Sequence, residues 1–244
     1  MYDLPRIHDT IKGMKTGNIF KQFLDSRVAW GYIQGPVYNR VIWDAAGETI
    51  REMVDRTPLA KPDVKALDVG SGPGYATLYA ARKHPTATII GVDYSPAQVK
   101  WSRRILARDP LPNCSFEIGD AMNLQFDDNT FDLVISIASI KHWPDPVWGL
   151  REISRVLKPG CAAHIGEADR DCGPRDFDIF ARAFTNRWWV NKPLVRWFLK
   201  GTVFGQSYTC EEAGRMASEA GFADVFIEKI HDRPFFRMVL TKSV

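Results

Sequence analysis

The chain has 244 residues, of which 45% are hydrophobic and 25% are charged, and its formal net charge is +3. This size allows one large domain, or one domain with appendages, and the composition is that of an ordinary soluble globular protein. So small a positive charge does not by itself indicate nucleic-acid binding.

The cysteines and the N-terminus bear on the cell compartment. The four cysteines lie far apart with no C-x-x-C pair, which argues against a zinc site or a disulfide scaffold and is typical of a reducing cytoplasm. The first residues contain no apolar signal core, and no stretch reaches about 18 uninterrupted apolar residues. We therefore expect a cytoplasmic protein with no secretion signal, no membrane span and no bound metal.

In chain order, the first predicted unit is a helical segment rich in aromatic residues. It covers residues 1–60, where Pro58 and then Pro62 interrupt the helical pattern. We expect it to form a cover on a larger unit of residues 61–244.

From Val64 onward, short β-rich runs alternate with amphipathic segments, which is typical of βαβ units on a parallel sheet. The predicted strands are residues 64–69, 87–92, 114–119, 131–136, 161–167, 224–229 and 235–241. The predicted helices are residues 74–84, 96–108, 146–157 and 210–220.

Several helix ends carry their own signals. Ser95 and Asp145 are predicted N-caps, each followed by a proline at the first helical position, and "TCEE" from Thr209 predicts a capping box. "KPG" at 158–160 is predicted to end a helix before the fifth strand.

A long insertion, about residues 168–208, separates the fifth and sixth predicted strands and is rich in arginine and aromatic residues. A connection of this length is uncommon unless it folds or serves as a lid. Three interpretations of the insertion are open. It can be a helix pair that packs its aromatic side chains and exposes its charges to water, or a lid over an aromatic or anionic substrate. It can also be a surface that reaches a lipid-like substrate.

The stretch "LDVGSGPGYA", residues 67–76, follows a predicted strand and precedes a predicted helix. Such a loop lies where open parallel sheets bind ligands, with helix N–H groups directed at the ligand. Gly70 and Gly72 fit the dinucleotide pattern G-x-G-x-x-G, but its third glycine position holds Tyr75, so the spacing argues against NAD.

Two further acids end neighbouring strands. Asp93 closes the second predicted strand, where a carboxylate can accept hydrogen bonds from both ribose hydroxyls of an adenosyl group. Asp120 closes the third, where it can accept the adenine amino group. The glycine loop, the two acids and the fourth predicted strand thus indicate a single groove of a size that fits a nucleoside.

With these motifs the chain resembles the class I S-adenosylmethionine-dependent methyltransferases, in particular the small-molecule branch of the ubiquinone and menaquinone C-methyltransferase type. The matching stretches are "LDVGSGPG", "GVDYS", "GDAMNLQFDDNTFDLVISIASIKHW", "REISRVLKPGC" and "YTCEEAGRMASEAGFADV". The resemblance implies a seven-stranded sheet in the order 3-2-1-4-5-7-6, with the last strand antiparallel and helices on both faces.

The resemblance also implies site residues. The backbone of the glycine loop would lie along the methionine part of the cofactor. Asp68 would orient the amino group of that part or order the loop, and Ser136 and Ile137 would lie under the sulfonium. The implied cofactor-binding residues are Asp68, Gly70, Gly72, Gly74, Asp93, Tyr94, Asp120, Ala121, Ser136 and Ile137. Candidates for the substrate pocket are Tyr32, Tyr38, Trp43, Arg187 and Trp188.

Each of these residues also has a simpler interpretation. The glycines can serve only to turn the chain, Asp93 can cap the next helix, and Asp120 can be an ordinary turn residue. His142, in the loop after the fourth strand, is a candidate general base. In the similar plant O-methyltransferases the base is the histidine of H-D-W-x-D, and alignment on Trp143 puts Lys141 at that place, so His142 can equally be a packing or substrate-contact residue.

We therefore expect methyl transfer from S-adenosylmethionine to a small aromatic, anionic or lipid-like acceptor by direct in-line displacement. Alternatives are an RNA or protein methyltransferase, a cofactor-binding module without catalysis, and an NAD(P) oxidoreductase on a related sheet. An N-P-P-Y/F motif after the fourth strand and a Pro-Cys nucleophile are both absent, which disfavours nucleic acid as substrate.

Overall fold

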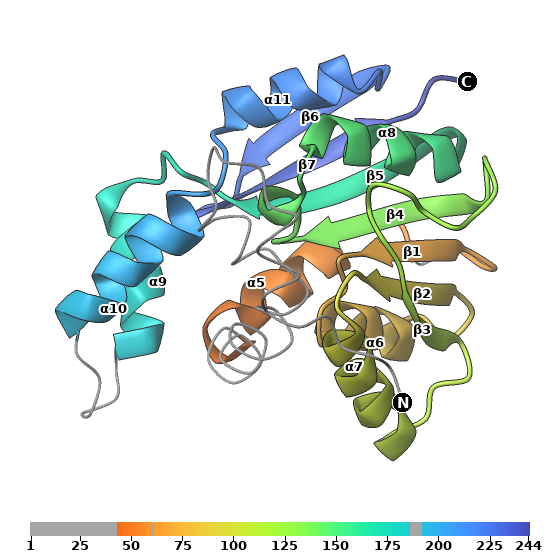
Figure 1. Ribbon diagram of the computed structural model, residues 1–244, viewed down its shortest axis with the longest axis horizontal. Coiled ribbons are helices and arrows are strands. Elements are labelled where there is room, and N and C mark those ends of the chain that lie inside the picture. The colour runs from red at the N-terminus through yellow and green to blue at the C-terminus, as the bar shows by residue number, and fades with distance from the viewer. Residues whose placement is uncertain (1–42, 60, 186–191) are drawn as a thin grey trace, which may run out of the picture.

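The computed structural model describes residues 43–59, 61–185 and 192–244. Its centre is a seven-stranded sheet in the order β3-β2-β1-β4-β5-β7-β6 (Figure 1). The strands are β1 (Lys65–Val69), β2 (Thr88–Asp93), β3 (Cys114–Ile118), β4 (Phe131–Ile137), β5 (Leu157–Ala168), β6 (Asp224–Lys229) and β7 (Phe235–Thr241). Neighbouring strands from β3 to β5 pair in parallel, and β7 is antiparallel to both β5 and β6. The predicted fold class and strand order are confirmed.

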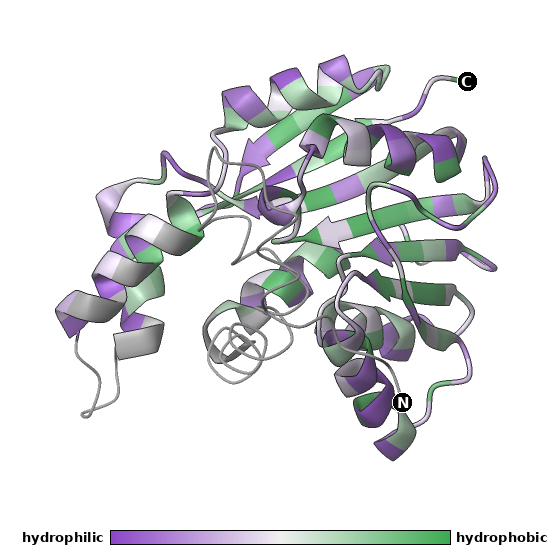
Figure 2. Ribbon diagram, in the orientation of Figure 1, coloured by the Kyte–Doolittle hydropathy of each residue, from purple (hydrophilic) through white to green (hydrophobic). Residues whose placement is uncertain are grey.

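Helices cover both faces of the sheet, which is why the central strands are hydrophobic along most of their length (Figure 2). The helices are α5 (Trp43–Asp55), α6 (Tyr75–Lys83), α7 (Pro96–Arg108), α8 (Pro146–Val156) and α11 (Cys210–Glu219). Side chains of α5 and α6 share one buried cluster with β1, β2 and β4, and α7 packs beside α6. Side chains of α8 and α11 share the second cluster with the opposite face.

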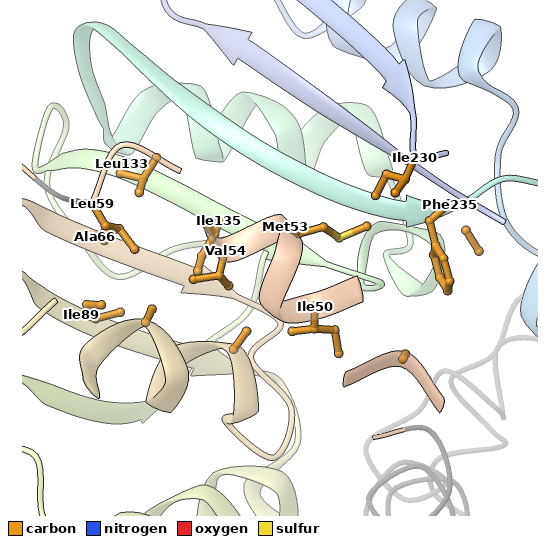
Figure 3. Packing of buried hydrophobic residues seen from close by; sticks show 14 of the residues in the cluster. Ile50, Met53, Val54, Leu59, Ala66, Ile89, Leu133, Ile135, Ile230 and Phe235 are labelled. Carbon is orange, nitrogen blue, oxygen red and sulfur yellow. The ribbon is translucent and has the colours of Figure 1, made fainter. Parts of the chain in front are cut away.

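The structure describes residues 43–59 of the predicted N-terminal cover, which include helix α5; residues 1–42 and residue 60 lie outside the described residues. Met53 and Val54 of α5 lie over Ile135 of β4 (Figure 3). A Cβ placed on Gly166 of β5 would lie 2.3 Å from the Sδ of Met53, so this glycine lets the helix approach the strand closely.

The insertion between β5 and α11 contains α9 (Pro174–Thr185), α10 (Lys192–Phe198) and the π-helical turn η4 (Leu199–Phe204). Phe180 of α9 packs edge-to-face against Phe204 and Phe235, with ring centroids 5.6 and 5.2 Å apart. Arg196 of α10 pairs with Asp178 of α9 at 2.6 Å. The described part of the insertion is therefore a pair of helices anchored to the sheet by aromatic packing.

Two local predictions are corrected. Strand β5 begins at Leu157, not 161, because Lys158-Pro159-Gly160 form an irregularity inside the strand rather than a turn before it. Gly160, with φ of +72°, absorbs the register shift that this causes against β4. Ser95 occupies the N-cap position of α7, but its side chain makes no capping hydrogen bond.

The other helix starts follow the prediction. Asp145 accepts the N–H of Trp148 at the start of α8, and Thr209 forms a reciprocal capping box with Glu212 at the start of α11. Among the described helices, none combines the length and apolar character needed to cross a bilayer.

Candidate functional site

The candidate site lies at the carboxyl ends of β1, β2, β3 and β4. The N–H groups of Gly70 and Ser71 both donate to the carbonyl of Val92, at 2.8 and 2.9 Å, which holds the glycine loop against the end of β2. The N–H of Gly119 donates to the carbonyl of Asp93 at 3.1 Å, so the next loop is joined to the same strand end. The predicted convergence of the strand ends is observed.

The three glycines of the loop all have positive φ, but they serve different purposes. A Cβ on Gly70 would meet the Oγ of Ser139 at 1.9 Å, and one on Gly74 would meet the ring of Phe116 at 2.5 Å. These two glycines therefore allow close packing within the protein. No described atom lies within 4 Å of a Cβ placed on Gly72, so the loop faces open space at this glycine.

Asp93 connects the glycine loop to the start of α7. Its Oδ2 accepts the N–H of Gly72 at 2.7 Å and its Oδ1 accepts the N–H of Ser95 at 2.8 Å. Burial raises the pKa of this carboxyl to about 6, and the two backbone hydrogen bonds oppose that rise. Asp93 therefore accepts the N–H of the N-cap residue Ser95, which is a different contact from the one predicted for the Ser95 side chain. The Ser95 Oγ has no hydrogen-bond partner among the described residues.

Asp68 is buried beneath the loop. Its Oδ2 accepts the hydroxyl of Thr77, in the first turn of α6, at 2.6 Å. Burial raises the pKa of Asp68 to about 7, the hydrogen bond from Thr77 lowers it, and the nearby charge of Asp93 raises it further. This contact joins Asp68 to the helix that follows the glycine loop, and both roles expected for Asp68 stay predictions.

Asp120 lies just beyond β3, where its Oδ1 accepts the N–H of Met122 at 2.9 Å. Ala121 is partly buried against the hydrophobic cluster under α8, and Tyr94 is exposed over 42% of its surface. Ser136 is fully buried, and its hydroxyl donates to the carbonyl of Val69 at 2.7 Å, which joins β4 to β1. Ile137, at the end of β4, packs against the cluster under α5.

The loop after β4 bends sharply back over the glycine loop. Ala138 has a φ of +57° and donates its N–H to the carbonyl of Gly166 at 2.7 Å. A short 3₁₀ turn, η3 (Ile140–His142), follows, and the Trp143 indole donates to the Oγ of Ser139 at 3.0 Å. His142 is half-buried in this turn, directly after the buried Lys141.

Sequence reasoning missed a buried ion pair beside this turn. The Nζ of Lys141 lies 2.6 Å from Oε1 of Glu167 at the end of β5, and the same oxygen accepts the N–H of Ala168 at 2.8 Å. The only signal in the sequence is a single acid inside the apolar run "AAHIGEA", at a strand end. Charged groups at such a position are rarely buried without a partner.

The substrate-pocket candidates fall largely outside the described residues. Tyr32, Tyr38, Arg187 and Trp188 lie there, and of Trp43 only the backbone, at the start of α5, is described. Within the described ranges, no group of three or more His, Cys, Asp or Glu side chains is arranged to hold a metal ion.

Comparisons with known proteins identify the family of the chain. Residues 67–165 match a family model described as a methyltransferase domain. The chain is 32% identical over 189 residues to an uncharacterized methyltransferase of Schizosaccharomyces pombe, and the match covers 72% of this chain and 68% of that protein.

A second relative is the chloroplastic 2-methyl-6-phytyl-1,4-hydroquinone methyltransferase of Arabidopsis thaliana. It is 35% identical over 183 residues, which cover 73% of this chain but only 46% of the relative, so the chain spans under half of that protein. A solved SAM-dependent methyltransferase from Aquifex aeolicus shares the fold, with a TM-score of 0.60 at 16% identity over 84% of this chain and 94% of the other. The chain belongs to the class I S-adenosylmethionine-dependent methyltransferases and is an enzyme of that family.

Proposed function

We propose that this methyltransferase transfers the methyl group of S-adenosylmethionine to a small aromatic acceptor of the hydroquinone class. The observation that carries the donor site is the contact between Asp93 and Gly72. The carboxylate accepts the N–H of the one loop glycine at which a Cβ would meet open space. The Arabidopsis relative, whose name specifies a hydroquinone, supports the acceptor class.

The chemistry of the strand ends suits an adenosyl donor. Asp93 keeps lone pairs that Gly72 and Ser95 do not use, and these can accept the ribose hydroxyls. Asp120 and Ala121, with Tyr94 beside them, would border the adenine. The Gly70–Gly74 backbone would hold the methionine part near the N-terminus of α6, whose partial positive charge favours a carboxylate.

When bound, S-adenosylmethionine supplies an electrophilic methyl group on a positively charged sulfur. The protein must align the acceptor with that methyl group and exclude water, and positioning of this kind supplies about 7–11 kcal/mol in well-oriented intramolecular models. Ser136 and Ile137 would form the floor under the sulfur. Residues 1–60 and the 168–208 insertion would close over the acceptor, with Tyr32, Tyr38, Trp43, Arg187 and Trp188 in contact with it.

His142 would take the proton that the acceptor loses. In a hydroquinone, removal of a hydroxyl proton increases the electron density on the oxygen and on the ring carbons ortho to it, and either can form the new bond to the methyl carbon. If a ring carbon forms the bond, that carbon then loses its hydrogen as a proton and the oxygen is protonated again, so that one proton is released by either route. The bonding pair of the broken S–C bond stays on sulfur. General-base assistance of this kind contributes about 10²–10⁴-fold.

The proposal is tested with the purified chain and S-adenosylmethionine labelled in the methyl group. Acceptors are hydroquinones with and without a prenyl tail, a monohydric phenol, and total RNA, and Asp93→Ala is the inactive control. Label in a hydroquinone product that Asp93→Ala does not form supports the proposal. Label confined to RNA or to protein, or no transfer to any hydroquinone, contradicts it.

A further inference from the structure

Helix α8 carries three polar side chains on one face, Trp148, Glu152 and Arg155, at positions i, i+4 and i+7. Glu152 and Arg155 are the acid and the second arginine of the "REISRVLKPGC" stretch, which resembles the family but has no role assigned above. The face is turned toward the loop of residues 119–130 between β3 and β4. This loop lies beside α8 in Figure 1, and Asp120 is its second residue.

All three side chains bind the backbone of that loop. The Trp148 indole donates to the carbonyl of Met122 at 2.9 Å, and Glu152 accepts the N–H of Leu124 at 2.9 Å. The Arg155 guanidinium donates to the carbonyls of Leu124 and Phe126, each at 2.8 Å. Every second residue of the loop, from 122 to 126, is therefore held by one face of α8.

Glu152 and Arg155 also fix each other. Two guanidinium nitrogens of Arg155 lie 2.8 Å from the two carboxylate oxygens of Glu152, a bidentate arrangement. The hydrogen bond from Arg155 is the main cause of a lowered pKa at Glu152, so the carboxylate stays charged at neutral pH. Arg155 reaches further along the loop to Asp128 at 2.8 Å.

A continuous path of hydrogen bonds leads from α8 to the start of the loop. Trp148 holds the carbonyl of Met122, and the N–H of Met122 donates to Oδ1 of Asp120 at 2.9 Å. Because that contact orients the Asp120 carboxylate, the direction in which this acceptor points depends on Trp148 as well as on the strand end. Trp148 is 49% exposed, so burial alone does not explain the placement of its indole.

We propose that Trp148, Glu152 and Arg155 are positioning residues that give the donor site its selectivity for adenine. The inference rests on the proposed function, in which Asp120 and Ala121 border the adenine. With the loop held at residues 122, 124 and 126, the Asp120 carboxylate is kept where it can accept the 6-amino group. A base with an oxygen at that position is rejected, because two acceptors would then face each other.

The test compares two ligands, S-adenosylhomocysteine and S-inosylhomocysteine, which carries an oxygen in place of the 6-amino group. Dissociation constants are measured by calorimetry for the wild-type chain, Trp148→Phe, Glu152→Gln and Arg155→Lys. Arg151→Lys is the matched control, because Arg151 lies on α8 and donates to the Glu219 carbonyl, away from the loop. Thermal unfolding is recorded for each variant.

The wild-type chain and Arg151→Lys are expected to prefer the adenine ligand about tenfold or more, as for a site that reads a hydrogen-bond donor. In the three loop variants the preference is expected to fall at least threefold, with S-adenosylhomocysteine bound more weakly. Trp148→Phe keeps an aromatic ring at an exposed position, so it tests the inference even if the charged variants fail to fold.

Two results overturn the inference. One is a melting temperature that falls in the loop variants while the preference for adenine stays unchanged, since these side chains would then serve stability alone. The other is a wild-type chain that binds both ligands equally. A third result, that the wild-type chain binds neither ligand, would contradict the proposed donor site itself. The inference would then be wrong as well, because it rests on that site.

Discussion

The ammonium group of Lys141 lies 2.6 Å from the carboxylate of Glu167, and the two side chains are only 6% and 0% exposed. The pair joins the loop after β4 to the end of β5, next to His142. Because both charges are removed from water, each depends on the other for its compensation. The loop that carries the candidate base is thus supported by a buried charge on the neighbouring strand.

Loss of one partner of this pair should be costly. Lys141→Met leaves the Glu167 carboxylate buried without its cation, and we expect the free energy of unfolding to fall by about 3–5 kcal/mol. Lys141→Met combined with Glu167→Gln should lose clearly less than the sum of the two single changes. The free energy of unfolding of the single and double variants is measured by urea unfolding. As a control, Arg82→Met breaks the exposed pair with Asp109, also at 2.6 Å, and should cost about 0–1 kcal/mol.

Gly72 and Gly70 should respond differently to the same substitution. Gly72→Ala should fold with only the strain of a positive φ, of order 1 kcal/mol, because no described atom lies near its Cβ. Its affinity for S-adenosylhomocysteine should fall at least tenfold, because the methyl group enters the proposed donor site. Gly70→Ala should lower the melting temperature far more, since its Cβ would meet the Oγ of Ser139 at 1.9 Å. Calorimetry and thermal unfolding together distinguish the two, and unimpaired binding by a folded Gly72→Ala would contradict the prediction.

Binding of S-adenosylhomocysteine should weaken as the pH falls below about 6. The pKa of Asp93 in the ligand-free chain is raised to about 6, and ribose hydroxyls donate to the ionised carboxylate. Protonation therefore competes with binding: affinity is full above the pKa and falls by at most about tenfold for each pH unit below it.

The measurement is calorimetry between pH 5 and pH 8. Asp93→Asn should bind weakly and without this pH dependence, whereas Asp68→Asn, which removes the other carboxyl with a raised pKa, should retain it. An unchanged profile in Asp93→Asn would assign the titration to another group.

His142→Gln tests the proposed base. With a hydroquinone acceptor, kcat should fall by about 10²–10⁴-fold while the dissociation constant of S-adenosylhomocysteine stays the same. If only KM for the acceptor rises and kcat is unchanged, His142 is a contact residue. Steady-state kinetics over a range of acceptor concentrations separates the two outcomes.

Much of the fold could be predicted because its signals are local. The edges of β1, β2, β3 and β4 lie within one residue of the predicted ones, and the caps at Asp145 and Thr209 form as expected, since each depends on residues a few positions apart. The predicted start of β5 is four residues too late. A glycine such as Gly160 is typical both of a turn that ends a helix and of an irregularity inside a strand, and the sequence does not distinguish the two. Ser95 occupies the N-cap position of α7 as predicted, but its side chain makes no capping hydrogen bond, and its N–H donates to the Asp93 carboxylate.

From its sequence alone, this chain has an identifiable order of elements, a glycine loop with acids at successive strand ends, and a resemblance to one family of enzymes. The tertiary structure alone decides which groups meet: Lys141 with Glu167, Asp93 with Gly72, and Trp148, Glu152 and Arg155 with the loop after β3. The physical reason is distance along the chain. Periodicity and capping act over a few residues, whereas these partners are 21 to 31 positions apart and meet only once the strands have paired and α8 has packed on the sheet.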